Sequence, residues 1–96
     1  MAKDKEKVID EVWTEARIRE FLDIKPAAGI DADFHRLQKA YHSMRADNFA
    51  DFVTMFVADG HNINACDPWR RTVLSYALEH RNSAEFVAVL QRNGAQ

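Results

Sequence analysis

The sequence is poor in glycine, proline and cysteine. Its 96 residues contain three glycines, two prolines and one cysteine. Sheet proteins need glycine and proline at their many tight turns, so this scarcity argues against an all-β chain and favours helices. A single cysteine cannot form an internal disulfide, which fits a reducing compartment. The length corresponds to one domain.

The sequence also lacks a strong net charge and any long apolar run. Its formal net charge is −2. Proteins that bind nucleic acid usually carry a basic surplus, because contacts with phosphates dominate their affinity. No stretch approaches the roughly 18 apolar residues that a membrane-spanning helix needs, and no signal-peptide pattern follows the start. We therefore expect a cytoplasmic protein with no membrane contact and with nucleic acid as a weak candidate for its partner.

The first residues alternate in charge. Residues 1–7 mix lysines with acidic residues, which predicts a solubilising, flexible leader. Residues 8–96 are predicted to form one helical domain. Its first apolar residues follow at near-helical spacing and fit either a short helix or an extended lead-in: Val8, Ile9, Val12 and Trp13.

Capping residues and apolar spacing predict two helices in the first half. Thr14 is expected to cap a helix from Glu15 to about Leu22. Asp31 is expected to cap a second helix that ends near Arg45, whose cation suits a helix C-terminus. The apolar positions of the first helix are Ala16, Ile18, Phe21 and Leu22, and those of the second are Phe34, Leu37, Tyr41 and Met44.

Three more helices are predicted in the second half. Asp47 or Asn48 is expected to cap the third helix, Thr72 the fourth, and Asn82 or Ser83 the fifth. Gly60 and Gly94 are expected to end the third and fifth helices in the left-handed conformation. The apolar positions are Phe49, Phe52, Val53 and Phe56, then Val73, Leu74, Ala77 and Leu78, then Phe86, Val87, Val89 and Leu90.

The chain resembles itself when it is shifted by 34 residues. The shift places Phe52 on Phe86 and Gly60 on Gly94, and it also aligns these pairs: Ala40 with Leu74, Met44 with Leu78, Asn48 with Asn82 and Val53 with Val87. A fixed period of this length is typical of stacked repeats, in which each helical hairpin covers apolar side chains that its neighbour cannot bury alone.

The residues of this repeat resemble an ankyrin repeat. The ankyrin pattern joins a Gly-Ala-Asp-Val-Asn-Ala-x-Asp loop to a Gly-x-Thr-Pro-Leu helix start, and its second helix carries Glu-(Ile/Val)-Val and ends on Gly-Ala. Three groups of residues match it: Gly60, Ile63, Asn64, Ala65 and Asp67 in the loop, then Arg71, Thr72, Leu74 and Ala77 in the first helix, then Glu85, Phe86, Val87, Leu90, Gly94 and Ala95. The resemblance covers about residues 47–95.

The chain also departs from the ankyrin pattern. The family's glycine before the first helix is Arg70, its proline is Val73, its histidine is Ser75, and its Gly-His pair is Arg81-Asn82. The resemblance implies an all-α stack of about five helices, with ankyrin-like helix–loop–helix units and an N-terminal helical cap. As a whole, the chain also resembles short bacterial proteins of unknown function.

The ankyrin resemblance implies protein binding through the loop tips and the adjacent helix face. The positions that correspond to partner-facing ones are Pro68, Trp69, Arg71, Glu79 and His80, and Arg70 adds a further donor. Tryptophan and arginine are enriched at binding hot spots, which favours Trp69 as the main contact. The sequence leaves open whether Trp69 is exposed or folds back into the core.

No set of residues in the sequence predicts catalysis, a metal or a cofactor. His35 and His42 could share a helix face, but no third ligand accompanies them and no zinc motif is present. Cys66 has no activating base marked near it. We therefore expect a protein that is not an enzyme, has no cofactor and binds no metal.

Two functions remain open at this point. The first is a protein-interaction module, an adaptor or regulator, that uses residues 61–71 and the neighbouring helix face. The alternative is a small nucleic-acid-binding protein that uses Arg70, Arg71 and Arg81, with Arg92 nearby in the sequence. A short repeat stack also leaves an apolar end uncovered, which a second copy would cover, so the sequence leaves open whether the chain is a monomer or a weak homo-oligomer.

Overall fold

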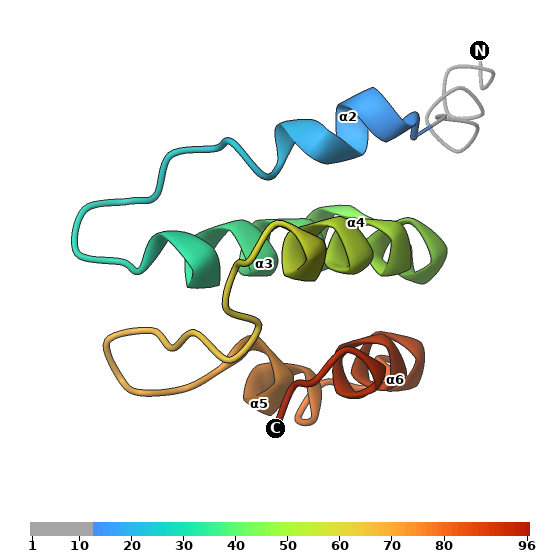
Figure 1. Ribbon diagram of the computed structural model, residues 1–96. Coiled ribbons are helices and arrows are strands. Elements are labelled where there is room, and N and C mark those ends of the chain that lie inside the picture. The colour runs from blue at the N-terminus through green and yellow to red at the C-terminus, as the bar shows by residue number, and fades with distance from the viewer. Residues whose placement is uncertain (1–12) are drawn as a thin grey trace, which may run out of the picture.

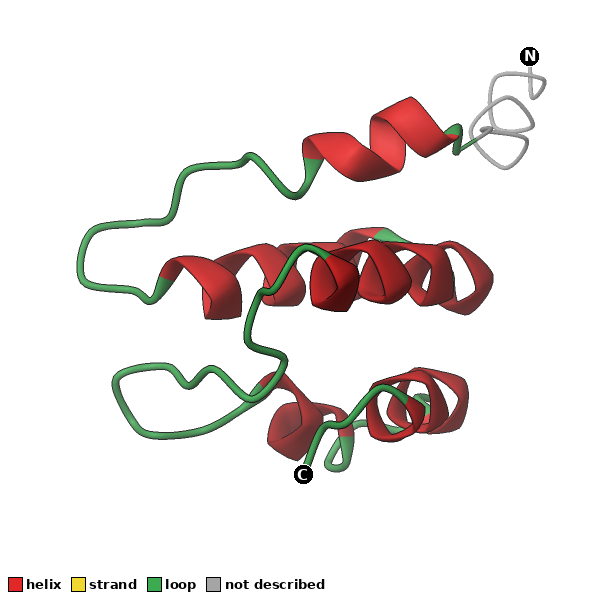
Figure 2. Ribbon diagram, in the orientation of Figure 1, coloured by secondary structure: helices red, strands yellow, loops and turns green. Residues whose placement is uncertain are grey.

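Five helices in three layers make up the part of the chain that the computed structural model describes, residues 13–96. The first layer is α2 (Glu15–Glu20), the second pairs α3 (Ala32–Ser43) with α4 (Ala46–Ala58), and the third pairs α5 (Val73–Ala77) with α6 (Ala84–Arg92) (Figure 1). Long loops join the layers (Figure 2). This confirms the all-α prediction, whereas the leader at residues 1–7 and the two alternatives for Val8, Ile9 and Val12 lie outside the described residues.

Three of the predicted N-caps are confirmed. The side chain of Thr14 accepts a hydrogen bond from the Arg17 amide, that of Asp31 from Phe34, and that of Thr72 from Ser75, each at 3.1 Å. Each bond satisfies an amide that the first helical turn would leave without a partner. Helices α2, α3 and α5 therefore begin where their local sequence dictates.

The predicted cap of α4 is wrong. The helix begins at Ala46, and its N-cap is Arg45, which makes no side-chain capping bond. Only Met44, which is buried, and Arg45 separate α3 from α4, so the next helix starts before Asp47. Asp47 instead lies in the first turn, where its carboxylate suits the helix dipole and pairs with Arg45 at 4.0 Å. The Arg45 cation consequently lies at the start of α4 and not at the end of α3.

The turn between α5 and α6 is longer and is closed by a hydroxyl. Ser83 is the N-cap residue of α6, as predicted, but it makes no capping bond to that helix. Its hydroxyl donates to the carbonyls of Ala77 and His80, which holds the end of α5 in place. The left-handed residue of this turn is Asn82, with φ of 60°, one position after Arg81.

Helix ends recur 34 residues apart. The C-cap residues Met44 and Leu78 differ by 34 positions, as do Asp59 and Asn93. The chain then turns at Gly60 and Gly94, both with positive φ, as predicted. The amides that follow these glycines close matching turns, from His61 to Phe56 at 3.1 Å and from Ala95 to Leu90 at 3.0 Å. The helix starts do not match, since α3 and α4 extend further toward their N-termini than α5 and α6.

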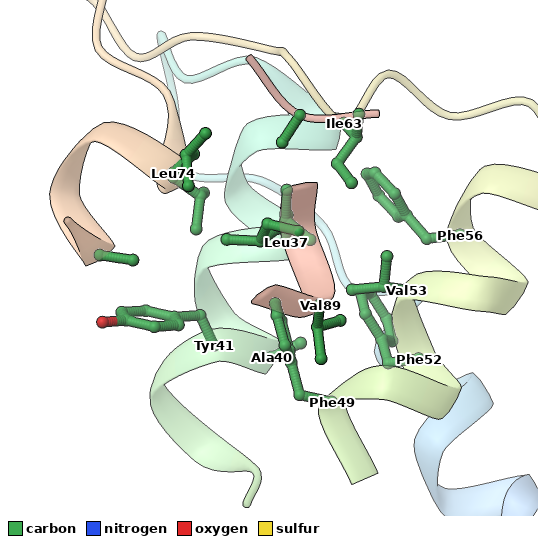
Figure 3. Packing of buried hydrophobic residues seen from close by; sticks show 14 of the residues in the cluster. Leu37, Ala40, Tyr41, Phe49, Phe52, Val53, Phe56, Ile63, Leu74 and Val89 are labelled. Atoms are coloured by element: carbon green, nitrogen blue, oxygen red, sulfur yellow. The ribbon is translucent and has the colours of Figure 1, made fainter. Parts of the chain in front are cut away.

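Each layer packs on the one before it. Helix α4 packs between α2 and α6, and α3 packs on α5. The ring of Phe52 lies 6.5 Å from that of Phe21 in the first layer, and the ring of Phe86 lies 5.3 Å from that of Phe49 in the second. Figure 3 shows the buried side chains of α3 and α4 between these layers, among them Leu37, Phe49, Phe52 and Phe56. Phe52 and Phe86 therefore both pack toward the preceding layer, although Phe52 is fully buried and Phe86 only partly.

Some positions predicted to be buried are not. Ala16 in α2 is exposed, and Leu78 at the end of α5 keeps 60% of its surface exposed. Phe86 and Val87 are only partly buried. Leu78 and Val87 belong to the last layer, on which no further described element packs, so their apolar surface remains uncovered.

The helices are also short. None within residues 13–96 combines the length and the apolar character that crossing a bilayer requires.

Candidate partner-binding surface

A tight hairpin at residues 66–72 carries four of the six predicted contact residues: Pro68, Trp69, Arg70 and Arg71. Cys66 and Thr72 form an antiparallel bridge, and the Asp67 amide donates to the Arg71 carbonyl at 3.0 Å. One carboxylate oxygen of Asp67 accepts the amides of Trp69 and Arg71, each at 2.9 Å. The other accepts the hydroxyl of Tyr76 in α5. Asp67 is buried and thus ties the tip of the hairpin to the helix behind it.

The structure answers the open question about Trp69. Its side chain is 75% exposed, the highest value among the large hydrophobic residues of the described chain. Pro68 and Arg70 on either side of it are exposed as well. The main-chain amides of Trp69 and Arg71 donate to the buried Asp67, whereas the side chains of Pro68, Trp69 and Arg70 face the solvent.

Arg70 adopts a backbone conformation that favours glycine. Its φ is 65°, in the left-handed region. A residue with a Cβ atom pays a conformational cost there, of about 1–2 kcal/mol. The hairpin therefore carries a cation at a position where glycine would be unstrained.

The contact between Asp67 and Tyr76 shifts both pKa values. Burial disfavours the ionised Asp67, but hydrogen bonds from Tyr76, Arg71 and Trp69 and the charge of Arg71 outweigh it, so the pKa of Asp67 lies below its ordinary value. The pKa of Tyr76 is raised, first because its hydroxyl bonds to Asp67 and then by burial. At neutral pH the pair is therefore a phenol that donates to a carboxylate.

Arg71 and Glu79 are joined in an ion pair. The Arg71 guanidinium donates to the Glu79 carboxylate at 2.6 Å. Its central carbon also lies 4.3 Å from the centre of the Tyr76 ring, in a cation–π arrangement. These two predicted contact residues are thus brought together, and each neutralises the other.

His80 lies at the other end of α5 and is bound to α3. Its Nδ1 atom is 2.6 Å from the Tyr41 hydroxyl, and the two rings stack with centroids 5.7 Å apart. Burial raises the pKa of Tyr41, so its hydroxyl stays protonated at neutral pH. His80 is therefore held against α3 and not by the hairpin.

A small cavity between α3 and α5 was missed by the sequence analysis. It has a volume of about 100 Å³, and its lining residues are Gln38, Tyr41, His42, Val73, Tyr76 and His80. Tyr76 also carries the contacts with Asp67 and Arg71, so the cavity and the hairpin are parts of one surface. The only sequence signal was that Gln38 and His42 are polar positions of a predicted amphipathic helix.

The histidines and Cys66 are not gathered into a reactive centre. Within residues 13–96, no group of three or more His, Cys, Asp or Glu side chains is placed to hold a metal ion. His61 bonds to Asp33 at 2.9 Å, and the Cys66 thiol faces the Asn64 carbonyl at 3.6 Å. The arginines of the alternative function are also apart, because Arg70 and Arg71 precede α5 whereas Arg81 follows it.

Comparison with known proteins adds no similarity to this picture. No protein-family model, no curated protein and no solved structure matches the chain.

Proposed function

We propose that this chain is a non-catalytic protein-interaction module, an adaptor or regulator, that binds a partner protein through residues 61–71 and the adjacent face of α5. The observation that carries this proposal is the exposure of Trp69 at the tip of the hairpin. A tryptophan side chain gains much free energy when a partner covers it, and tryptophan and arginine dominate binding hot spots. Arg70 stands directly beside it.

The way in which the hairpin is held supports the same proposal. Asp67 fixes the main chain on both sides of Trp69 through the amides of Trp69 and Arg71, and Tyr76 fixes Asp67. A loop held in one conformation loses little entropy when it binds. Trp69 is therefore presented on a rigid support.

The charges of this surface favour a protein over a nucleic acid. Arg71 is neutralised by Glu79, and Arg81 lies beyond α5. Neutralising many phosphates requires cations that are both close together and free. The chain has a net charge of −2 and thus lacks the positive electrostatic potential that a nucleic-acid-binding surface provides.

The test is affinity purification from the native cells with the immobilised full chain, comparing the wild type with Trp69→Ala. We expect the wild type to capture a partner that Trp69→Ala loses. With the purified partner, the Kd should rise about thirtyfold, as for a hot-spot residue. Leu78→Ala is the matched control, because it removes an exposed apolar side chain at the other end of α5.

Two results would count against the proposal. Capture of the same partners by Trp69→Ala, with the helical circular dichroism and melting temperature unchanged, would remove the hairpin as the docking site. Capture that nuclease abolishes, and that Arg70→Ala and Arg81→Ala weaken, would instead favour the nucleic-acid alternative.

A further inference from the structure

The cavity between α3 and α5 has the size of one side-chain end. Its volume of about 100 Å³ is room for a few water molecules or a single polar group. Val73 and Tyr76 supply its wall on α5, and Gln38 and His42 supply part of the opposite wall on α3. It can therefore select a ligand by one functional group.

Hydrogen-bond donors surround this cavity. The side chains of Gln38 and His42 make no hydrogen bond within residues 13–96. When the Tyr41 hydroxyl donates to Nδ1 of His80, the neutral imidazole carries its hydrogen on Nε2, which no described residue accepts. The amide of Gln38 and the imidazoles of His42 and His80 can each donate a hydrogen bond, and the Lys39 cation lies close by. Such a set of donors suits a small anion with one or two oxygen atoms, such as a carboxylate.

The charges around the cavity also suit an anion. Lys39, one turn before His42, has no ion-pair partner among residues 13–96, and neither has Arg70. Of the acids on this surface, Glu79 is paired with Arg71, whereas Asp67 keeps its negative charge while it accepts the hydroxyl of Tyr76. Burial lowers the pKa of His42, and the neighbouring His80 and Lys39 lower it further, so His42 is uncharged at neutral pH and offers a hydrogen bond rather than a charge.

Tyr76 connects this cavity to the hairpin. Its ring lines the cavity, its face receives the Arg71 guanidinium, and its hydroxyl bonds to the Asp67 that supports Trp69. A chain that contacts Trp69 and continues past Tyr76 reaches the cavity. The partner is therefore expected to place an acidic residue a short distance along the chain from the residue that covers Trp69.

We propose that the cavity between α3 and α5 binds the carboxylate of an aspartate or glutamate side chain presented by an extended acidic segment of the partner protein. Gln38 and the imidazoles of His42 and His80 donate to the carboxylate, and Lys39 adds its charge. This inference rests on the proposed function, because it names the chemistry of the partner that Trp69 engages.

The test uses a random linear peptide library displayed on phage and selected on the immobilised full chain at neutral pH. Enriched peptides are expected to share an Asp or Glu at a constant distance from an apolar residue. For a synthetic peptide of this kind, replacing the acid with its amide should weaken binding about tenfold, as loss of a charge-assisted hydrogen bond does. His42→Ala should weaken it by a similar factor, and the two losses should not add.

The control is His35→Ala, the same substitution on α3 at a histidine that does not line the cavity. It should leave the Kd unchanged. Enriched peptides that need Trp69 but have no required acid, that are basic, or that bind His42→Ala as tightly as the wild type would overturn the acidic-segment proposal and leave the proposed function standing. Peptides that bind independently of both Trp69 and His42, or no enrichment at all, would overturn both.

Discussion

The hydroxyl of Tyr76 in α5 donates a hydrogen bond to the buried carboxylate of Asp67, nine residues earlier in the chain. The same carboxylate holds the amides of Trp69 and Arg71. One side chain therefore links the fold of the hairpin to the position of the exposed tryptophan. Removing it should affect both stability and binding.

The Asp67–Tyr76 contact should be measurable as a coupling between two substitutions. Asp67→Asn should lower the free energy of unfolding by about 2 kcal/mol and Tyr76→Phe should lower it by less, because each breaks a hydrogen bond of the Asp67 carboxylate. The double variant should lose clearly less than the sum, since both changes remove the same interaction. Urea unfolding followed by circular dichroism tests this, and additive losses would show that the two groups do not interact in solution.

The same contact predicts how stability depends on pH. The pKa of Asp67 is lower in the folded chain than in the unfolded one, so its contribution is present above the ordinary carboxyl pKa of 3.8 and disappears as the pH falls through the folded value. The pKa of Tyr76 is raised, so its contribution is present below about 10 and disappears as the pH rises through the folded value.

Urea unfolding of the wild type and of Asp67→Asn across the acid range measures the first effect. The stability difference between the two should be constant near neutral pH and shrink in acid. A difference that stays the same down to the lowest pH would mean that the Asp67 carboxylate is not preferentially ionised in the folded state. Tyr76→Phe serves in the same way at alkaline pH.

Arg70→Gly should stabilise the chain. Arg70 has a φ of 65°, and glycine adopts this conformation without the Cβ penalty, although it also gains freedom in the unfolded state. The net gain should be about 1 kcal/mol, which raises the melting temperature by roughly 4–8 °C in a domain of this size. Differential scanning calorimetry measures it.

Arg81→Gly is the matched control for this substitution. Arg81 is an exposed arginine in the turn after α5 and is not among the described residues with positive φ. Glycine there should destabilise the chain, because only the unfolded state gains. Equal effects of the two substitutions would mean that Arg70 is not held in the left-handed conformation.

The uncovered last layer should make the chain self-associate weakly at high concentration. Leu78 is 60% exposed and lines a shallow surface depression with Ala84 and Val87. Burying this apolar surface against a second copy is favourable. Sedimentation velocity should show a mass that rises with concentration, and Leu78→Lys should abolish the rise. The control is Val57→Lys, a less exposed apolar position on α4; a concentration-independent monomer would contradict the prediction.

Much of the helical framework could be predicted from the sequence. The starts at Thr14, Asp31 and Thr72 and the stops at Gly60 and Gly94 follow from bonds between residues only a few positions apart, which depend on local residue types. The matching helix ends 34 residues apart also follow from such local signals. The start of α4 could not be predicted in this way, because its N-cap Arg45 makes no side-chain capping bond and so leaves no local signal.

The sequence by itself determined the helical class and most helix boundaries, since each depends on contacts along a single turn of chain. Only the tertiary structure decided that Trp69 is exposed, that His80 bonds to Tyr41 across 39 residues, and that a cavity lies between α3 and α5. These features depend on which layers cover a side chain. Stacking of the layers brings together residues that are distant in sequence, and a local sequence pattern does not show which of their surfaces stay exposed to solvent.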